Sequence, residues 1–162
     1  MCKHRLALVL AITVTAACSS ALAESQEELV GSITDVKGTI HLLRGQNEVA
    51  SGKGTRLYAS DIIRTDAEAG VGVVLRDDTT LSLGPSSELK MSEFEFKPDE
   101  GILGMTLSVA RGTLVYISGQ IAKLAPGSAQ IATPAGVAAV RGTELLVEVP
   151  APKAGKKAER AQ

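Results

Sequence analysis

The sequence contains very few aromatic residues. Its 162 residues include two Tyr, two Phe and no Trp. Proteins that bind single-stranded nucleic acid stack the bases on several aromatic side chains, so this class is disfavoured. Lys and Arg number 17 against 18 Asp and Glu, and the chain therefore lacks the basic surface that a nucleic-acid-binding protein needs. We expect no nucleic-acid partner, and the scarcity of aromatic residues also disfavours a glycan-binding module.

Cysteine and histidine are equally scarce. The two cysteines are Cys2 and Cys18, and His41 is the only histidine after residue 4. A multi-histidine metal site and a Ser-His-Asp arrangement with a spare base are therefore excluded. The acidic pairs Asp77-Asp78 and Asp99-Glu100 are typical of turns, in which Asp binds its own backbone. We expect no catalytic residue, no metal and no cofactor, and hence no enzyme.

The first 23 residues have the pattern of a secretory signal peptide. Lys3 and Arg5 precede a largely apolar stretch at residues 6–18, and the small residues Ala-Leu-Ala stand just before Glu24. A membrane-anchoring helix is the alternative, but 13 apolar residues fall short of the roughly 20 that span a bilayer. We expect residues 1–23 to be cleaved, leaving a periplasmic or secreted product with no transmembrane helix.

A second cleavage site competes with the first. Thr15-Ala16-Ala17-Cys18 resembles a bacterial lipobox, whose cysteine is lipidated and becomes the mature N-terminus. The usual leucine position is occupied by Thr15, so we favour cleavage before Glu24 and keep a lipoprotein anchored through Cys18 as the alternative. Cleavage before Glu24 removes both cysteines, which excludes disulfides from the mature chain.

The chain ends in a basic segment. Residues 24–150 carry 11 basic and 17 acidic side chains, whereas the last 12 residues carry four basic side chains and one acidic. This end has no large apolar residue, so we expect residues 150–162 to be a disordered tail. It serves as a solubilising end, or makes weak contact with an anionic surface.

The middle of the chain shows the alternating apolar pattern of β-strands. Residues 71–83 read as a hairpin with its turn at Arg76–Thr79, and a bulge near Ser92-Glu93 reconciles two apolar faces that are out of step. No window of 11 or more residues has helical apolar spacing. Further strands are expected at residues 107–117, 130–133, 137–141 and 144–149. The pattern predicts an all-β domain over residues 24–149: a compact sandwich, a roll or a β-helix-like stack.

Two segments of the chain resemble each other. Residues 37–46 align without a gap against residues 111–120, which indicates two related β units at about 31–97 and 106–149. Within them, a basic residue, Gly and Thr recur as Lys37-Gly38-Thr39, Arg111-Gly112-Thr113 and Arg141-Gly142-Thr143. Gly inside a strand marks a bulge, a bend or a close backbone approach. We favour a structural role for these triplets over an anion pocket lined by their basic residues.

Several motifs together resemble the FecR domain family. They include Thr133-Pro134 followed by a strand of small residues, Arg141-Gly142-Thr143 and an apolar strand, and, earlier, Arg111-Gly112-Thr113 and much of residues 57–96. The resemblance covers about residues 33–149 in the right order. It implies a β domain that senses or binds a partner in the bacterial envelope, and it marks the motif residues as family features.

The founding members of the family join such a domain to a membrane helix and a cytoplasmic part that contacts a sigma factor. Only five residues precede the apolar stretch here, so we expect no cytoplasmic part and a stand-alone exported protein. The expected function is binding of an envelope protein, for sensing or as a scaffold. The alternative from another class is binding of lipopolysaccharide or another amphiphile in a β-groove, in a structural or transport role.

Overall fold

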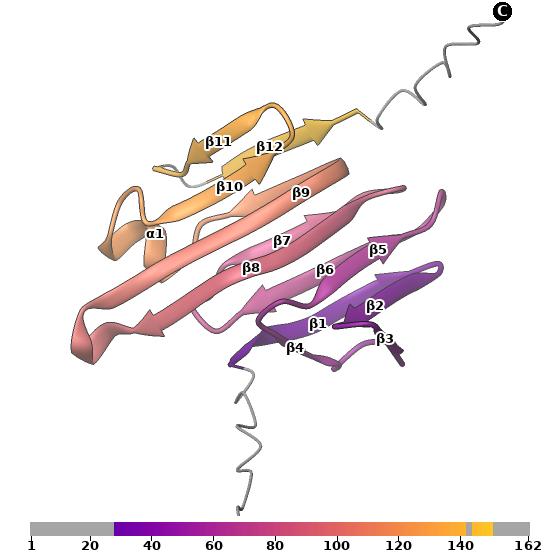
Figure 1. Cartoon of the computed structure of the whole chain (residues 1–162), viewed down its shortest axis with the longest axis horizontal. Helices are drawn as coiled ribbons and strands as arrows, with labels where there is room; N and C mark the ends of the chain where they lie inside the picture. The colour runs from indigo at the N-terminus through magenta and orange to yellow at the C-terminus, as the bar shows by residue number, and fades with distance from the viewer. Residues whose placement is uncertain (1–27, 142–143, 151–162) are drawn as a thin grey trace, which may run out of the picture.

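A computed structural model describes residues 28–141 and 144–150 of the chain. Twelve strands, a 3₁₀ turn η1 (Pro98–Glu100) and one short helix α1 (Gln120–Leu124) make up this part (Figure 1). The strands are β1 (Leu29–Lys37), β2 (Ile40–Arg44), β3 (Asn47–Val49), β4 (Arg56–Tyr58), β5 (Ile62–Thr65), β6 (Gly70–Leu75), β7 (Thr80–Leu83), β8 (Glu88–Lys97), β9 (Ile102–Ile117), β10 (Ala129–Thr133), β11 (Gly136–Ala139) and β12 (Glu144–Val149). The predictions for the leader, Cys18, Gly142, Thr143 and the tail beyond residue 150 lie outside the described residues.

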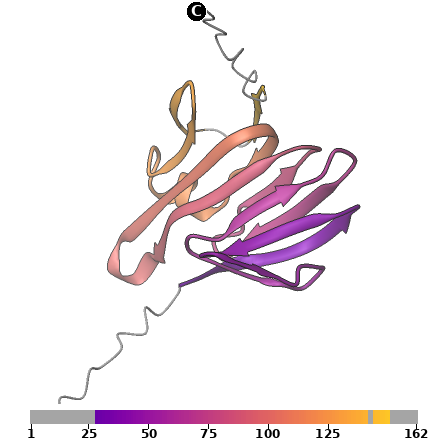
Figure 2. The same ribbon diagram turned by 45° about the vertical axis from the view of Figure 1, so that its right-hand side comes forward.

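All twelve strands belong to one curled sheet, which confirms the predicted all-β class (Figure 2). Nine of them follow the order β3-β2-β5-β8-β9-β7-β6-β1-β4, while β10 and β12 pair with β9, and β11 pairs with β10. Each pair is antiparallel except β9 with β10. The architecture is a roll, because a β-helix-like stack would require parallel ladders.

The sheet consists of two halves that continue into each other. Half-sheet A contains β4, β1, β6, β7, the C-terminal part of β9 and β12; half-sheet B contains β3, β2, β5, β8, the N-terminal part of β9, β10 and β11. The registers place strands end to end: β7 pairs with residues 114–117 of β9, and β8 pairs with residues 102–111. We call each such line of strands a lane. The lanes are β4/β3, β1/β2, β6/β5, β7/β8, β9 and β12/β10.

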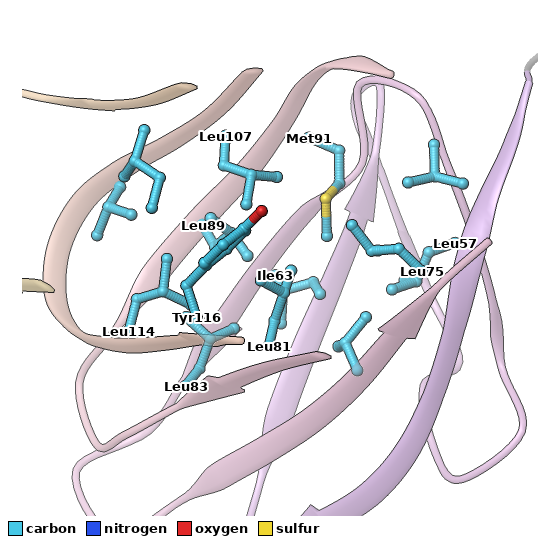
Figure 3. Close-up of a cluster of buried hydrophobic side chains, with 14 of the residues drawn as sticks. Leu57, Ile63, Leu75, Leu81, Leu83, Leu89, Met91, Leu107, Leu114 and Tyr116 are labelled. Atoms are coloured by element: carbon cyan, nitrogen blue, oxygen red, sulfur yellow. The ribbon is translucent and has the colours of Figure 1, made fainter. Parts of the chain in front are cut away.

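The hydrophobic core lies between the two half-sheets. Figure 3 shows Leu81, Leu114 and Tyr116 of half-sheet A among Leu89 and Met91 of half-sheet B, and all five side chains are at most 1% exposed. Full burial of one such side chain contributes about 1.5–3 kcal/mol. The side chains come from both halves, so neither half-sheet can bury its apolar face without the other.

Local strand patterns predicted much of this fold correctly. The β6–β7 hairpin, the register shift between Met91 and Glu93, and the bounds of β12 are all confirmed. The long strand β9 begins at Ile102 rather than at residue 107, and β11 ends at Ala139 rather than at residue 141. The helix α1 was not predicted, because its five residues are too few to show a helical period.

The two segments that resemble each other in sequence contribute to one sheet. In the first, β2 turns at Gly45 into β3, whereas the matching part of the second continues through β9 into α1. Strand β9 also pairs with β7 and β8, which belong to the first of the two units expected from the sequence. Within the described ranges, no helix is long and apolar enough to cross a membrane.

Candidate functional site

Two of the three basic-Gly-Thr triplets lie where a lane passes between the half-sheets. Gly38 separates β1 from β2 with φ +72°, and Gly112 lies within β9 with φ +91°. This left-handed backbone region is strained for residues with a Cβ. Both glycines therefore occupy the bends of their lanes. Of the third triplet, only Arg141 falls within the described residues.

The bend at Gly112 is packed against the bend of the neighbouring lane. A Cβ added to Gly112 would overlap the Oγ and Cα atoms of Ser87, which lies in the turn between β7 and β8. The backbone N–H of Thr113 donates to Ser87 Oγ at 2.9 Å, and the N–H of Gly84 donates to the carbonyl of Thr113 at 2.9 Å. Gly112 is thus required both for its backbone conformation and for this close approach.

Hydrogen bonds join the bends of the four lanes from β1/β2 to β9. Asp66 donates its N–H to the carbonyl of Thr39 at 3.2 Å, and the N–H of Ser86 donates to the carbonyl of Asp66 at 2.9 Å. The Thr65 hydroxyl accepts from the N–H of Ser87 at 2.8 Å and donates to the carbonyl of Gly84 at 2.7 Å. These bonds satisfy backbone groups that leave the strand ladders at the bends.

Charged side chains form a ladder across the outer face of half-sheet B. The registers place His41, Arg64, Glu88 and Arg111 opposite one another on β2, β5, β8 and β9. Glu88 lies 3.2 Å from Arg64 (Oε2 to Nε) and 3.5 Å from Arg111 (Oε2 to Nη2). The second basic residue of the triplets therefore pairs with a carboxylate of its own sheet.

His41 lies at the end of this charge ladder. Its Nδ1 is 2.5 Å from the Oε1 atom of Glu48, and its Nε2 is 3.5 Å from the Oδ1 atom of Asp66. The hydrogen bond with Glu48 raises the pKa of His41 above 6.5, and the charge of Asp66 adds to this effect.

The structure does not bring the basic residues of the triplets into one pocket. Lys37 ends β1 in half-sheet A, Arg111 is held beside Glu88 on half-sheet B, and Arg141 follows β11 as an exposed residue. Neither Lys37 nor Arg141 forms an ion pair with another described residue. Anion binding by three converging cations therefore has no geometric support in the described part of the chain.

One buried acid, Asp61, links β2 to the turn between β4 and β5. Asp61 is fully buried, and both of its carboxylate oxygens accept hydrogen bonds from Arg44 at 2.9 Å. Asp61 Oδ2 also accepts from the N–H of Tyr58 at 2.9 Å, and the Arg44 guanidinium lies 4.4 Å from the centre of the Tyr58 ring. The negative charge of Asp61 is thus balanced by Arg44 and its oxygens are hydrogen-bonded, as a buried charge requires.

A second buried acid, Asp77, attaches α1 to the β6–β7 turn. Asp77 Oδ1 accepts from the N–H of Thr79 at 3.1 Å, and Asp77 Oδ2 accepts from the Thr79 hydroxyl at 2.7 Å and from the N–H of Ile121 at 3.3 Å. Asp77 binds its own turn as the sequence predicted, and it also accepts a hydrogen bond from the first turn of α1.

Tyr116 lies close to this cluster. Its hydroxyl is buried without a well-formed hydrogen bond to a described residue. Burial raises the pKa of Tyr116 above 10.0, and the charge of Asp77 adds to the shift, while the nearby hydroxyls of Thr79 and Ser118 oppose it. The side chain is therefore a neutral core residue at physiological pH.

Thr133 and Pro134 line a groove beside the bend of β9. One part, of about 330 Å³, is formed by Thr133, Pro134 and Ala110 over the outer face of half-sheet B. The adjoining part, of about 290 Å³, is formed by Pro134, Ala110 and the end of β12 at Val149 and Pro150. The ends of β10 and β12 meet here from opposite directions, because β10 is parallel and β12 antiparallel to β9.

Strand β12 has a free edge next to this groove. Its six residues pair with residues 112–117 of β9, and among the described residues no strand pairs with its other side. In half-sheet B the corresponding position beside β10 is filled by β11. Among the described strands, half-sheet A thus has one strand fewer than half-sheet B, and none of them lies beside the outer edge of β12.

Apolar side chains are exposed along this edge. Leu146 is 63% exposed and lies opposite Val115, while Ile117 on β9 is 45% exposed. On the inner side, Leu145 and Val147 are only partly buried against the core. A strand added beside β12 would cover side chains on both faces of the sheet.

The chemistry that this region supports is binding of an extended chain. Its free backbone groups, exposed apolar side chains and adjoining groove match recognition by strand addition. No group of three or more His, Cys, Asp or Glu that could hold a metal ion occurs within residues 28–141 and 144–150. The sequence predicted β12 but not its edge position, because pairing between distant strands leaves no local pattern; its place as the last strand was the available signal.

The fold defines the class of the protein: the described residues form an all-β roll with an edge strand, β12, that no other described strand covers. A family model described as FecR protein matches residues 61–159, so the chain belongs to the FecR family, as its motifs predicted. The match covers β5 to β12 and leaves the strands before Asp61 outside it. The FecR family has regulatory and sensing roles at the cell envelope. Neither the curated proteins nor the solved structures contain a match to the chain.

Proposed function

We propose that the protein is an exported, non-enzymatic binding domain that recognises a protein partner in the bacterial envelope, for sensing or as a scaffold. The observation that carries this proposal is the outer edge of β12, which no other described strand covers. An exposed edge of six residues with apolar side chains on both faces is a liability for a protein that works alone. It becomes useful when a partner supplies the missing strand.

The N-terminal sequence supports an extracytoplasmic location. Its leader pattern directs the chain to the periplasm or outside the cell, or to a membrane through a lipid on Cys18. The near balance of basic and acidic residues in the sequence supports a protein partner rather than nucleic acid. The basic tail adds at most weak contact with an anionic surface.

Photo-crosslinking in living cells tests the proposal. A crosslinking amino acid replaces Leu146 in the full chain, and a second version carries it at Lys53, an exposed residue in the turn between β3 and β4. We expect one dominant protein adduct from position 146 and none of the same size from position 53. Mass spectrometry identifies the partner and reads the mature N-terminus, Glu24 or lipidated Cys18.

The apolar groove at Pro134 and Val149 favours a second candidate, binding of an amphiphile such as lipopolysaccharide. That function predicts lipid or glycan adducts, and co-purifying lipid, instead of a protein adduct. Recovery of lipid alone from position 146 would replace the first proposal with the second.

A further inference from the structure

The side chains that β12 presents on the outer face have an alternating character. Glu144, Leu146 and Glu148 are all exposed and lie two residues apart on one face of the strand. Neither glutamate forms an ion pair with another described residue. The outer face of β12 therefore presents an acidic, an apolar and an acidic side chain, in that order along the strand.

A strand added beside β12 would place its own side chains directly opposite these three. Directly opposed residues in an antiparallel pair have Cβ atoms about 4.5–5.5 Å apart, so opposite charges attract and like charges repel. On the neighbouring strand β9, Val115 lies opposite Leu146 and Ile117 lies opposite Glu144, so Leu146 is part of an apolar patch. The position opposite Leu146 therefore favours an apolar side chain.

We propose that β12 binds an extended partner segment that runs antiparallel to it and carries a basic, an apolar and a basic residue opposite Glu148, Leu146 and Glu144. This inference rests on the proposed function and specifies the chemistry of the segment. Val149 and Pro150 line the groove at the end of β12, so the residue that precedes the first basic residue lies at the groove and is apolar.

A second copy of the chain fits this edge poorly. Two β12 strands that pair antiparallel about Leu146 place Glu144 of each copy opposite Glu148 of the other. Like charges directly opposite each other destabilise a pair of strands. Acidic residues on an edge strand are also a known means of preventing self-association. The two glutamates thus oppose dimerisation and favour a basic partner.

Binding of synthetic peptides to the purified full chain tests the inference. The probe is Ile-Val-Lys-Val-Leu-Thr-Lys, labelled for fluorescence anisotropy, and the control peptide Ile-Lys-Val-Thr-Leu-Lys-Val has the same composition with each lysine moved to the other face of the strand. A third peptide replaces both lysines of the probe by glutamate. We expect the probe to bind at least about tenfold more tightly than either of the others.

Charge reversal on the protein tests the pairing directly. The double variant Glu144→Lys with Glu148→Lys should lose about tenfold in affinity for the lysine peptide and should gain affinity for the glutamate peptide. The matched control, Glu68→Lys with Glu95→Lys, makes the same change of charge at exposed positions outside β12. It should leave the preference unchanged, which separates a local pairing from the general field of the protein.

Each result bears on one claim. A preference that survives in the β12 double variant, or that disappears equally in the control variant, overturns the inference. A dimer of the free protein that dissociates when Glu144 and Glu148 are made neutral also overturns it. So does binding that occurs only after Lys153, Lys156, Lys157 and Arg160 are all replaced by alanine, because the tail would then be the occupant.

A protein adduct from position 146 without the charge preference overturns the inference alone, whereas no adduct overturns the proposed function.

Discussion

Single glycines determine where the sheet of this protein bends. Gly112 has positive φ and lies against Ser87, whereas Gly104, in the same strand, has no heavy atom within 4 Å of where a Cβ would be. Glycine is therefore required at position 112 by the backbone conformation and by the close approach of Ser87, whereas position 104 requires neither and serves as the control.

We expect Gly112→Ala to lower the free energy of unfolding by about 2–4 kcal/mol, because it adds both backbone strain and an overlap with Ser87. Gly104→Ala should change it by less than about 1 kcal/mol in either direction. Urea unfolding of the two variants and the parent measures both values. Equal effects at the two positions would show that the bend does not depend on Gly112.

His41 should titrate with a raised pKa because of Glu48 and Asp66. A histidine whose pKa is higher in the folded state stabilises the fold fully below pH 6.5 and loses this contribution as the pH rises through its raised pKa. Since the side chain is exposed, the effect on stability is small. NMR titration of the His41 ring should give a pKa above 6.5, and Glu48→Gln should bring it closer to that value. An unchanged pKa in the variant would assign the shift to other groups.

At the scale of single elements, α1 depends on one buried carboxylate. Asp77→Ala leaves the N–H groups of Thr79 and Ile121 and the Thr79 hydroxyl without their acceptor. We expect a loss of about 1–3 kcal/mol in stability and faster amide hydrogen exchange across α1. Asp78→Asn is the control, since Asp78 is exposed and accepts one bond from the Gln120 side chain at 2.7 Å, and Asn tolerates its left-handed backbone with φ +65°. Similar exchange in the two variants would contradict this role of Asp77.

Strands that the chain specifies locally were predictable, and strands that depend on distant partners were only partly so. The alternation of Val71, Val73 and Leu75 predicts β6 because one face of the strand is buried and the other is only partly buried. The bulge in β8 was visible because two apolar faces are out of step. The bend of β9 was not predicted, although its signal is of the same kind. The buried residues before Gly112 have odd numbers, as in Leu107 and Val109, whereas those after it, Leu114 and Tyr116, have even numbers.

The candidate site could be predicted from the sequence even less completely than the fold. The sequence predicted the residues and bounds of β12, yet nothing local distinguishes an edge strand from a central one until its neighbours are known. The groove at Thr133 and Pro134 forms only because β10 and β12 end against each other on β9. The family resemblance drew attention to Thr133 and Pro134, but it did not indicate that Val149 at the end of β12 lines the same groove as Pro134.

At the scale of the whole molecule, the two half-sheets should unfold together. They share β9 and one core, so a cavity in either half weakens both. We expect Leu81→Ala in half-sheet A and Leu89→Ala in half-sheet B each to lower the free energy of unfolding by about 2–5 kcal/mol. The transition should remain single when followed by circular dichroism and by hydrogen exchange in each half. Separate transitions would show that the halves are independent folding units.

The aligned bends give the sheet a crease, which runs from Gly38 across the turns of β5/β6 and β7/β8 to Gly112. Moving one strand along its neighbour by a single residue would carry a glycine out of the crease and put a side chain into a left-handed bend. It would also break the bonds that Thr65 makes with the adjoining lane. The crease therefore sets the alignment of four lanes at once, and it leaves the strand position beside β12 in a fixed register before any partner arrives.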